Sequence, residues 1–295
     1  MAPTAVQAPA PEASLSVFDR ALFKGKVLFA TGGGSGLGKD MVLTMMRHGA
    51  NAVIVGRNAE RLAQTAAELE AATGQRCIPA PADVRKLASL NEAAKLTIDT
   101  FGKIDFCICG AAGNFLAPLS ALSENAFKTV IEIDTIGTFN TYKATIPHIR
   151  KSHGAYLHIS ASLHYKGMVF QAHVSAAKAA VDALNQVIAI EEGPWGVRSN
   201  VLVPGPIADT PGMSRLSSLD DPASRKMQVP LGRLGARGDI SNAALFLFSP
   251  AANYITGTLL VVDGGEQHTR SGTNIFPYPE SVLDFESVKK MVPRL

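Results

Sequence analysis

The stretch KVLFATGGGSGLG, from Lys26 to Gly38, decides the fold of this chain. Its apolar first part, up to Ala30, predicts a buried strand, and a helical pattern follows from Lys39 to His48. Glycines between a strand and a helix allow a tight turn and let the backbone approach a pyrophosphate closely. The start of the helix offers free N–H groups and a positive dipole end to the same phosphates. The stretch therefore predicts a dinucleotide site rather than an ordinary glycine loop.

The same alternation of strand and helix continues along the chain. Further strands are expected at 52–56, 77–80, 104–109, 155–160, 198–203 and 259–262, with helices between them at 59–73, 87–101, 124–144 and 175–191. The expected strands are continuously apolar, which is typical of parallel strands covered on both faces. The pattern predicts an α/β fold, a single Rossmann-type doubly wound parallel sheet with helices on both faces.

The length and composition fit one such domain with a segment at each end. The chain has 295 residues, of which 46% are hydrophobic and 18% charged, and α/β domains of roughly 200–250 residues often form one unit. We place the catalytic domain at 23–268. Residues 1–22 are expected to be a disordered lead rich in Ala and Pro, and 269–295 a tail.

Charge and composition exclude several classes of partner. The net charge of +3 is only mildly basic, and no basic stripe with interleaved aromatic residues is present, so we expect no nucleic-acid partner. No run of about 18 apolar residues exists, so we expect no membrane span. The cysteines at 77, 107 and 109 have no framework spacing, which indicates a reducing compartment and buried small side chains. No CxxC or HExxH pattern occurs, and we expect no metal.

The expected cofactor is NADP(H). Its phosphates are expected to meet Thr31, Gly32, Gly34, Ser35, Gly36, Leu37 and Gly38. An acidic residue after the second strand would select NAD, whereas Arg57 stands there and suits a 2′-phosphate. The alternative for Arg57 is a solvated arginine at a helix start. Asp83, after the third strand, is expected to meet the adenine amino group or to be an ordinary cap.

The glycine loop, Asp83, the pair Pro204-Gly205 and the run Asp263-Gly264-Gly265 resemble the short-chain dehydrogenase/reductase family over roughly residues 23–267. The resemblance implies cofactor contacts from Pro204, Gly205, Ile207, Thr210 and Lys178. In that family a Tyr precedes the Lys by four residues, and a Ser precedes the Tyr by thirteen. Here Val174 and Ala161 occupy these two places. The interconversion of simple alcohols and ketones is therefore in doubt, because an alkoxide needs a positioned acid.

Longer strings resemble the peroxisomal 2,4-dienoyl-CoA reductase branch of that family: AAGNFL at 111–116, AFKTV at 126–130, IDTIGTFN at 133–140, AKAAVDA at 177–183 and PGPI at 204–207. This resemblance implies NADPH-dependent reduction of 2,4-dienoyl-CoA to 3-enoyl-CoA in the β-oxidation of unsaturated fatty acids. It also implies that Lys178 holds the nicotinamide ribose and that Asp134 is the catalytic aspartate. The ending Pro293-Arg294-Leu295 matches a peroxisomal address except at Pro293, so we expect a peroxisomal protein, otherwise a cytoplasmic one.

The implied chemistry fits a chain without the family Tyr. Hydride reaches the far end of a conjugated thioester, so negative charge appears on the thioester oxygen and a proton is needed at carbon. A carboxyl group with an ordinary pKa of about 3.9 is a poor acid at pH 7. We therefore expect Asp134 to orient a proton-giving water, with Asp263 as a partner. The alternative for Asp134 is a helix-packing residue bonded to the backbone.

The substrate contacts implied by the resemblance are Arg57, Arg85, Phe115, Ser123, Asn125 and Arg215, for an acyl-CoA thioester. Guanidinium groups suit the phosphates of coenzyme A, although solvated surface charges are the alternative for Arg85 and Arg215. Phe115 is an acyl contact or plain core, and Ser123 and Asn125 are substrate contacts or helix caps. The polar stretch 208–228 is expected to be a flap, and Thr210 to meet the cofactor as the flap closes.

Two other functions stay open at this point. One is a 2-enoyl-CoA reductase of the same fold, and the other is a non-catalytic NADP(H)-binding sensor in which Lys178 serves binding alone. The alanines of the helix after Ser175 allow close helix approach, and the family pairs this helix between subunits. We therefore expect a homo-oligomer, either a dimer or a tetramer.

Overall fold

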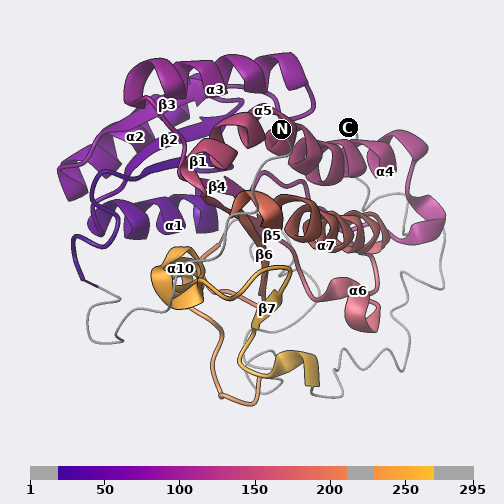
Figure 1. Cartoon of the computed structure of the whole chain (residues 1–295). Coiled ribbons are helices and arrows are strands. Elements are labelled where there is room, and N and C mark those ends of the chain that lie inside the picture. The colour runs from indigo at the N-terminus through magenta and orange to yellow at the C-terminus, as the bar shows by residue number, and fades with distance from the viewer. Residues whose placement is uncertain (1–18, 211–228, 269–295) are drawn as a thin grey trace.

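A seven-stranded parallel sheet forms the centre of the computed structural model, which describes residues 19–210 and 229–268. The strand order is β3-β2-β1-β4-β5-β6-β7, so the chain leaves β1 in one direction and returns to its other side at β4 (Figure 1). The strands are β1 Val27–Thr31, β2 Asn51–Gly56, β3 Cys77–Pro81, β4 Phe106–Cys109, β5 Ala155–Ile159, β6 Arg198–Pro204 and β7 Leu259–Val262. The predicted doubly wound parallel sheet is confirmed.

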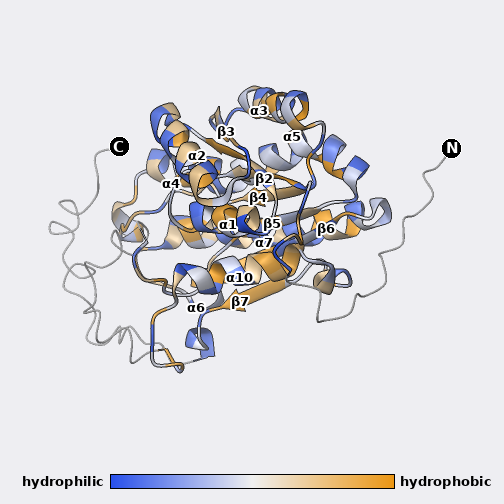
Figure 2. Cartoon of the chain, turned by 90° about the vertical axis from the view of Figure 1, so that its left-hand side faces the viewer, coloured by the Kyte–Doolittle hydropathy of each residue, from blue (hydrophilic) through white to orange (hydrophobic). Residues whose placement is uncertain are grey.

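Helices cover both faces of this sheet. Helices α1 (Gly36–Arg47), α2 (Ala59–Thr73) and α10 (Arg237–Phe248) pack on one face, and α3 (Leu87–Phe101), α5 (Gly137–Ser152) and α7 (Ala172–Glu192) on the other. Helix α4 (Glu124–Ile131) lies against α7, and the short α6 (Leu163–Lys166) precedes α7. Hydrophobic strands lie between helices whose polar residues face outward in Figure 2. Helices α6 and α10 were not expected from the sequence.

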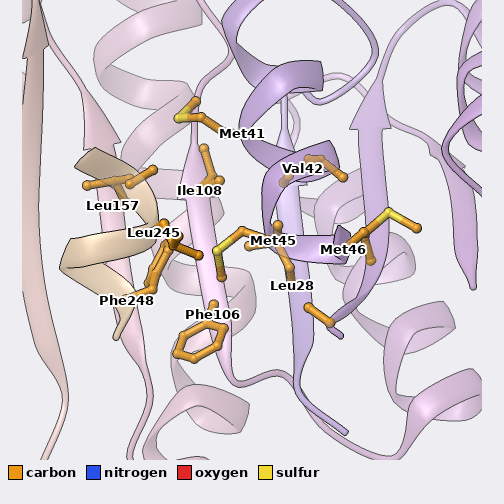
Figure 3. Close-up of a cluster of buried hydrophobic side chains, with 14 of the residues drawn as sticks. Leu28, Met41, Val42, Met45, Met46, Phe106, Ile108, Leu157, Leu245 and Phe248 are labelled. Carbon is orange, nitrogen blue, oxygen red and sulfur yellow. The ribbon is translucent and has the colours of Figure 1, made fainter. Parts of the chain in front are cut away.

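The core consists of two layers of apolar side chains, one on each face of the sheet. Along β1, Leu28 and Ala30 join the layer under α1 and α10, whereas Phe29 joins the layer under α3, α5 and α7. Figure 3 shows the first layer, where Met45 of α1 meets Phe106 of β4 and Phe248 of α10. Burial on both faces explains why the strands read as unbroken apolar runs.

Several boundaries differ from the expected ones. Helix α1 begins at Gly36 instead of Lys39, because the end of the glycine loop is already helical. Strand β4 begins at Phe106 instead of Ile104, since the Asp105 carboxylate turns to accept a hydrogen bond from Val27 N at 2.9 Å. The single helix expected at 124–144 is α4, a five-residue π turn at Glu132–Ile136, and α5, which extends to Ser152.

Most of the expected lead, residues 1–18, and the whole expected tail, residues 269–295, lie outside the described residues. Residues 19–22 form a turn that leads into Phe23, a core residue that is 2% exposed. Within 19–210 and 229–268, no helix combines the length and the apolar character needed to cross a bilayer.

Candidate active site

Asp134 and Lys178 form a buried ion pair beside the carboxyl ends of β4 and β5. Asp134 Oδ2 lies 2.9 Å from Lys178 Nζ, and their side chains are 0% and 6% exposed. Asp134 Oδ1 accepts a hydrogen bond of 2.7 Å from the backbone N–H of Gly113 in the segment after β4. Lys178 Nζ also donates to the carbonyl oxygen of Ile159, at the end of β5. The pair thus joins the two strand ends to each other.

A π turn aims the Asp134 side chain at this point. The turn spans Glu132–Ile136 between α4 and α5, and such widened turns are frequent at functional sites. Thr135 Oγ1 donates to the carbonyl oxygen of Ala177 at 3.2 Å, which fixes the turn to α7 one residue before Lys178. Asp134 is therefore held by both its backbone neighbours and its ionic partner, which leaves little freedom for the carboxylate.

The position that the family gives to Tyr is filled by an apolar core residue. Val174 is 2% exposed and packs with Val130 and Ala177. Removal of one partner from a buried ion pair commonly costs about 3–5 kcal/mol, so Asp134 and Lys178 are each a structural requirement of the other. The side chain at 174 cannot donate a proton, and the Asp134 carboxylate is the acidic group that the π turn brings beside Lys178.

The glycine loop forms a cradle that fits a pyrophosphate. Gly32 has a φ of +71°, and a Cβ there would lie 2.5 Å from the carbonyl oxygen of Gly110. A Cβ on Gly38 would overlap the carbonyl oxygen of Gly32. Ser35 precedes α1 and makes no capping hydrogen bond with its side chain, so its hydroxyl is available to a ligand. Backbone, helix start and free hydroxyl together make an anion site at the switch between β1 and β4.

Arg57, Asp83 and Arg85 lie together past the ends of β2 and β3. Arg85 Nη2 lies 2.6 Å from Asp83 Oδ2, and Arg85 Nε bonds both carboxylate oxygens at 3.0 Å. These hydrogen bonds from Arg85 hold the pKa of Asp83 below its usual range, with the nearby Arg57 charge adding a smaller effect. Arg57 is exposed and makes no ion pair with any residue that the structure describes. Its guanidinium is therefore available to a phosphate.

The residues expected after β6 are near the cofactor side of the sheet. Pro204 ends β6, and a Cβ on Gly205 would lie 2.5 Å from Asp263 Cβ, so these two segments touch. Ile207 is buried, and Thr210 Oγ1 donates to its carbonyl oxygen at 3.1 Å. The remainder of the expected flap, 211–228, lies outside the described residues.

The hydrogen bonds of Asp263 lie within its own turn, and none joins it to Asp134 among the described residues. Asp263 Oδ1 accepts from the N–H of Gly265 at 2.8 Å, and Oδ2 accepts from the N–H of Gln267 at 2.7 Å. Both carboxylate oxygens stabilise the turn after β7. The sequence could not distinguish this local capping role from a catalytic one, because an Asp before two glycines is typical of both.

The expected substrate residues separate into three groups. Phe115 is partly buried and stacks on the His173 ring, with ring centroids 4.2 Å apart. Ser123 caps α4 by accepting from Ala126 N, and Asn125 is exposed in the first turn of α4. Arg215 lies outside the described residues, and Arg85 is paired with Asp83 as described above.

Two contributors to the site were missed. The backbone N–H of Gly113 leaves no side-chain signal in a sequence. His173 could have been noticed, because it stands directly before Val174, the residue at the Tyr position. The three cysteines are buried and free, as expected, and burial raises the pKa of Cys77 to about 12. The structure shows no cluster of metal-ligating side chains within its described ranges.

Comparisons with known proteins agree with this geometry. A profile of the family described as Enoyl-(Acyl carrier protein) reductase matches residues 32–267. A peroxisomal 2,4-dienoyl-CoA reductase [(3E)-enoyl-CoA-producing] of Saccharomyces cerevisiae is 44% identical over 89% of this chain and 91% of that protein. Its Danio rerio counterpart is 46% identical over 84% of each chain. A 3-ketoacyl-(acyl-carrier-protein) reductase from Brucella melitensis complexed with NADH superposes with a TM-score of 0.77 at 27% identity, over 83% of this chain and 99% of that one.

Proposed function

The chain belongs to the short-chain dehydrogenase/reductase family, and from that premise we propose that it uses NADPH to reduce 2,4-dienoyl-CoA to 3-enoyl-CoA. The observation that carries the proposal is the buried Asp134–Lys178 pair beside an apolar residue at the Tyr position. Such a site lacks the relay that an alkoxide requires, yet it retains a fixed charge pair. The enzyme is an oxidoreductase that acts on CH–CH bonds in the β-oxidation of unsaturated fatty acids.

The cofactor fits the described residues. The cradle of Gly32, Gly34 and Gly38 with the start of α1 would hold the pyrophosphate, and the Lys178 ammonium would meet the nicotinamide ribose. When bound, the cofactor supplies a hydride to the far end of the conjugated thioester. The choice of NADPH over NADH rests on Arg57, whose free guanidinium suits a 2′-phosphate.

Asp134 acts on the second half of the reaction. After hydride addition, the thioester carries negative charge on oxygen and needs a proton at carbon. Asp134 is fixed by Gly113 N–H and Lys178, so its carboxylate orients a water without being the acid itself. Lys178 keeps the local field positive while the charge develops on the substrate. Both residues thus serve a reaction in which the final proton comes from water.

The thioester is recognised by charge and by an apolar wall. Phe115 stands beside the Asp134 site and offers an aromatic surface to the acyl chain. Arg57 and Arg85 lie within the same region past β2 and β3, where they suit the phosphates of coenzyme A. Binding of these phosphates competes with the pairing of Arg85 and Asp83.

We further propose a homo-oligomer, a dimer or a tetramer, in a peroxisomal setting. Helices α5 and α7 expose apolar side chains at Phe139, Val187 and Ile190, which are 44%, 51% and 77% exposed. Apolar surface of this kind on neighbouring helices suits an interface between subunits. The peroxisomal location is supported by the names of the relatives.

The experiment that tests the function is NADPH oxidation, followed at 340 nm, with a 2,4-dienoyl-CoA and a 2-enoyl-CoA of equal chain length. We expect turnover of the dienoyl substrate alone, with a double bond at carbon 3 of the product. Asp134→Ala should lose that turnover while it still binds NADPH. Turnover of the 2-enoyl substrate alone would identify a 2-enoyl-CoA reductase. Tight NADPH binding without turnover of either substrate would identify a sensor.

A further inference from the structure

His173 is a buried imidazole with unused capacity for hydrogen bonds. It lies in the first turn of α7, directly before Val174, and it is 0% exposed. Neither Nδ1 nor Nε2 makes a hydrogen bond of good geometry with the described residues, although a backbone group of Phe115 lies close to the ring. A buried polar group without a partner costs roughly 1–3 kcal/mol, so such groups in native proteins commonly bond to an ordered water or to a ligand.

The surroundings of His173 belong to the proposed active site. Its ring stacks on Phe115 with an interplanar angle of 27°. Burial lowers the pKa of His173 and outweighs two smaller effects that favour the charged imidazole, a hydrogen bond with the Phe115 backbone and the charge of the Asp134 carboxylate. The ring is therefore neutral at pH 7, with one nitrogen that donates and one that accepts.

A neutral imidazole next to a fixed carboxylate is a suitable pair of partners for one water molecule. Such a water needs two to four polar partners, roughly as found for buried waters in general. Asp134 Oδ2 faces the Lys178 ammonium at 2.9 Å and receives no other hydrogen bond from the described residues, so it can accept one more. A nitrogen of His173 and a lone pair of Asp134 thus lie in one buried environment.

We propose that His173 is a positioning residue that holds the proton-giving water against Asp134. This inference rests on the proposed function. In the step it serves, the O–H bond of the water breaks and a C–H bond forms at the charged thioester intermediate. The water regains a proton from bulk solvent, so each turnover consumes one hydride and one solvent proton. His173 itself keeps its proton throughout and fixes the place of the water.

Two substitutions separate this role from simple support of Phe115. His173→Phe preserves an aromatic ring for stacking but removes both nitrogens, whereas His173→Gln retains a donor and an acceptor. We expect His173→Phe to lower kcat about 100-fold, within the range known for lost proton transfer. The KM for dienoyl-CoA and the Kd for NADPH should stay within about threefold. His173→Gln should restore most of the lost kcat.

Isotope effects on kcat separate the two roles, because loss of a purely structural contact at His173 would leave them unchanged. In His173→Phe, proton delivery should limit the rate, so the solvent deuterium effect on kcat rises and the effect of deuterated NADPH falls. A His173→Phe enzyme with the kcat and isotope effects of the original chain would overturn the proposal. So would a rise in KM without a fall in kcat. If the original chain does not reduce dienoyl-CoA, the proposed function itself is wrong. That failure is distinguishable from a failure of the role of His173, because it is seen in the chain without any substitution.

Discussion

The nucleotide half of the molecule and the catalytic half are built in different ways. In the first, from β1 to β3, one contiguous loop brings backbone N–H groups and close-packed glycines to the ligand. In the second, Asp134, Lys178 and Gly113 come from three separate segments that meet at the ends of β4 and β5. The nucleotide half needs glycines without side chains, whereas the catalytic half needs side chains that are held by specific partners. An added methyl group should therefore damage the first half, and a lost charged group should damage the second.

The strongest test of this contrast is Asp134→Asn. We expect kcat to fall about 1000-fold, because the carboxylate that orients the water is lost. The Kd for NADPH should change by less than about threefold, since the cradle is untouched. The free energy of unfolding should fall by about 3 kcal/mol, because Lys178 is left buried without its partner. Stopped-flow measurement of turnover gives kcat, fluorescence titration gives the Kd for NADPH, and urea unfolding gives the free energy of unfolding.

Glu192→Gln is the matched control for Asp134→Asn. Glu192 is also a buried acid in an ion pair, with its Oε2 2.6 Å from Arg150 Nε. It lies far from the π turn in sequence and pairs at the opposite end of α7. Its loss should lower the melting temperature and leave kcat near that of the original chain. An equal fall in kcat for both variants would mean that stability, and not chemistry, explains the effect at Asp134.

The next test acts on the other half through Gly38→Ala. A methyl group would overlap the Gly32 carbonyl oxygen, so the cradle must distort at a cost of about 1–3 kcal/mol. This corresponds to a loss of NADPH affinity of up to about 100-fold. The kcat at saturating NADPH should change little. Gly238→Ala serves as the control, because a Cβ there meets nothing within 4 Å. Equal affinities for the two variants would contradict the role of the cradle.

A smaller effect is expected for Arg57→Ala. Hydrogen bonds to charged groups contribute about 1.5–3 kcal/mol, and Arg57 is exposed, so we expect NADPH affinity to fall about tenfold. NADH affinity should be unchanged, because NADH carries no 2′-phosphate. Calorimetric titration of the two cofactors measures the ratio directly. A parallel loss for both cofactors would show that Arg57 does not read the phosphate.

The smallest effect concerns pH and the catalytic half. His158 of β5 is completely buried, and burial lowers its pKa from 6.5 to about 4. The unfolded chain therefore takes up a proton below pH 6.5 that the folded chain does not, so stability falls as pH falls through this window. Between pH 7 and pH 5.5 the loss is about 1 kcal/mol. Urea unfolding at both pH values should show this slope for the original chain and a flatter one for His158→Gln. The exposed His268→Gln variant should keep the original slope.

The same contrast explains what could be predicted from the sequence. Helices α2 and α3 lie at the expected 59–73 and 87–101, because their caps and apolar period are local signals. Asp134 and Lys178 were identified as site residues by resemblance. The π turn and the Gly113 N–H depend on contacts between distant segments, and no local pattern encodes them, whereas His173 stands beside Val174 in the sequence and could have been noticed. Asp263 is a different case, since its hydrogen bonds are with two backbone groups of its own turn and an Asp before two glycines is typical of a cap as well as of a catalytic residue.

The π turn has a consequence for how the chain can change over time. It is continuous with α4 and α5, and within a few residues it buries Asp134 while Ile136 and Phe139 are 43% and 44% exposed. Such a turn accommodates one extra residue within a helix, so deletion of a single residue from 132–136 would close it into an ordinary helix. The Asp134 carboxylate would then lose its direction toward Lys178, whereas the helices on either side would keep theirs. A change of length in this stretch therefore acts on the buried carboxylate and leaves the apolar outer face of α5 in place.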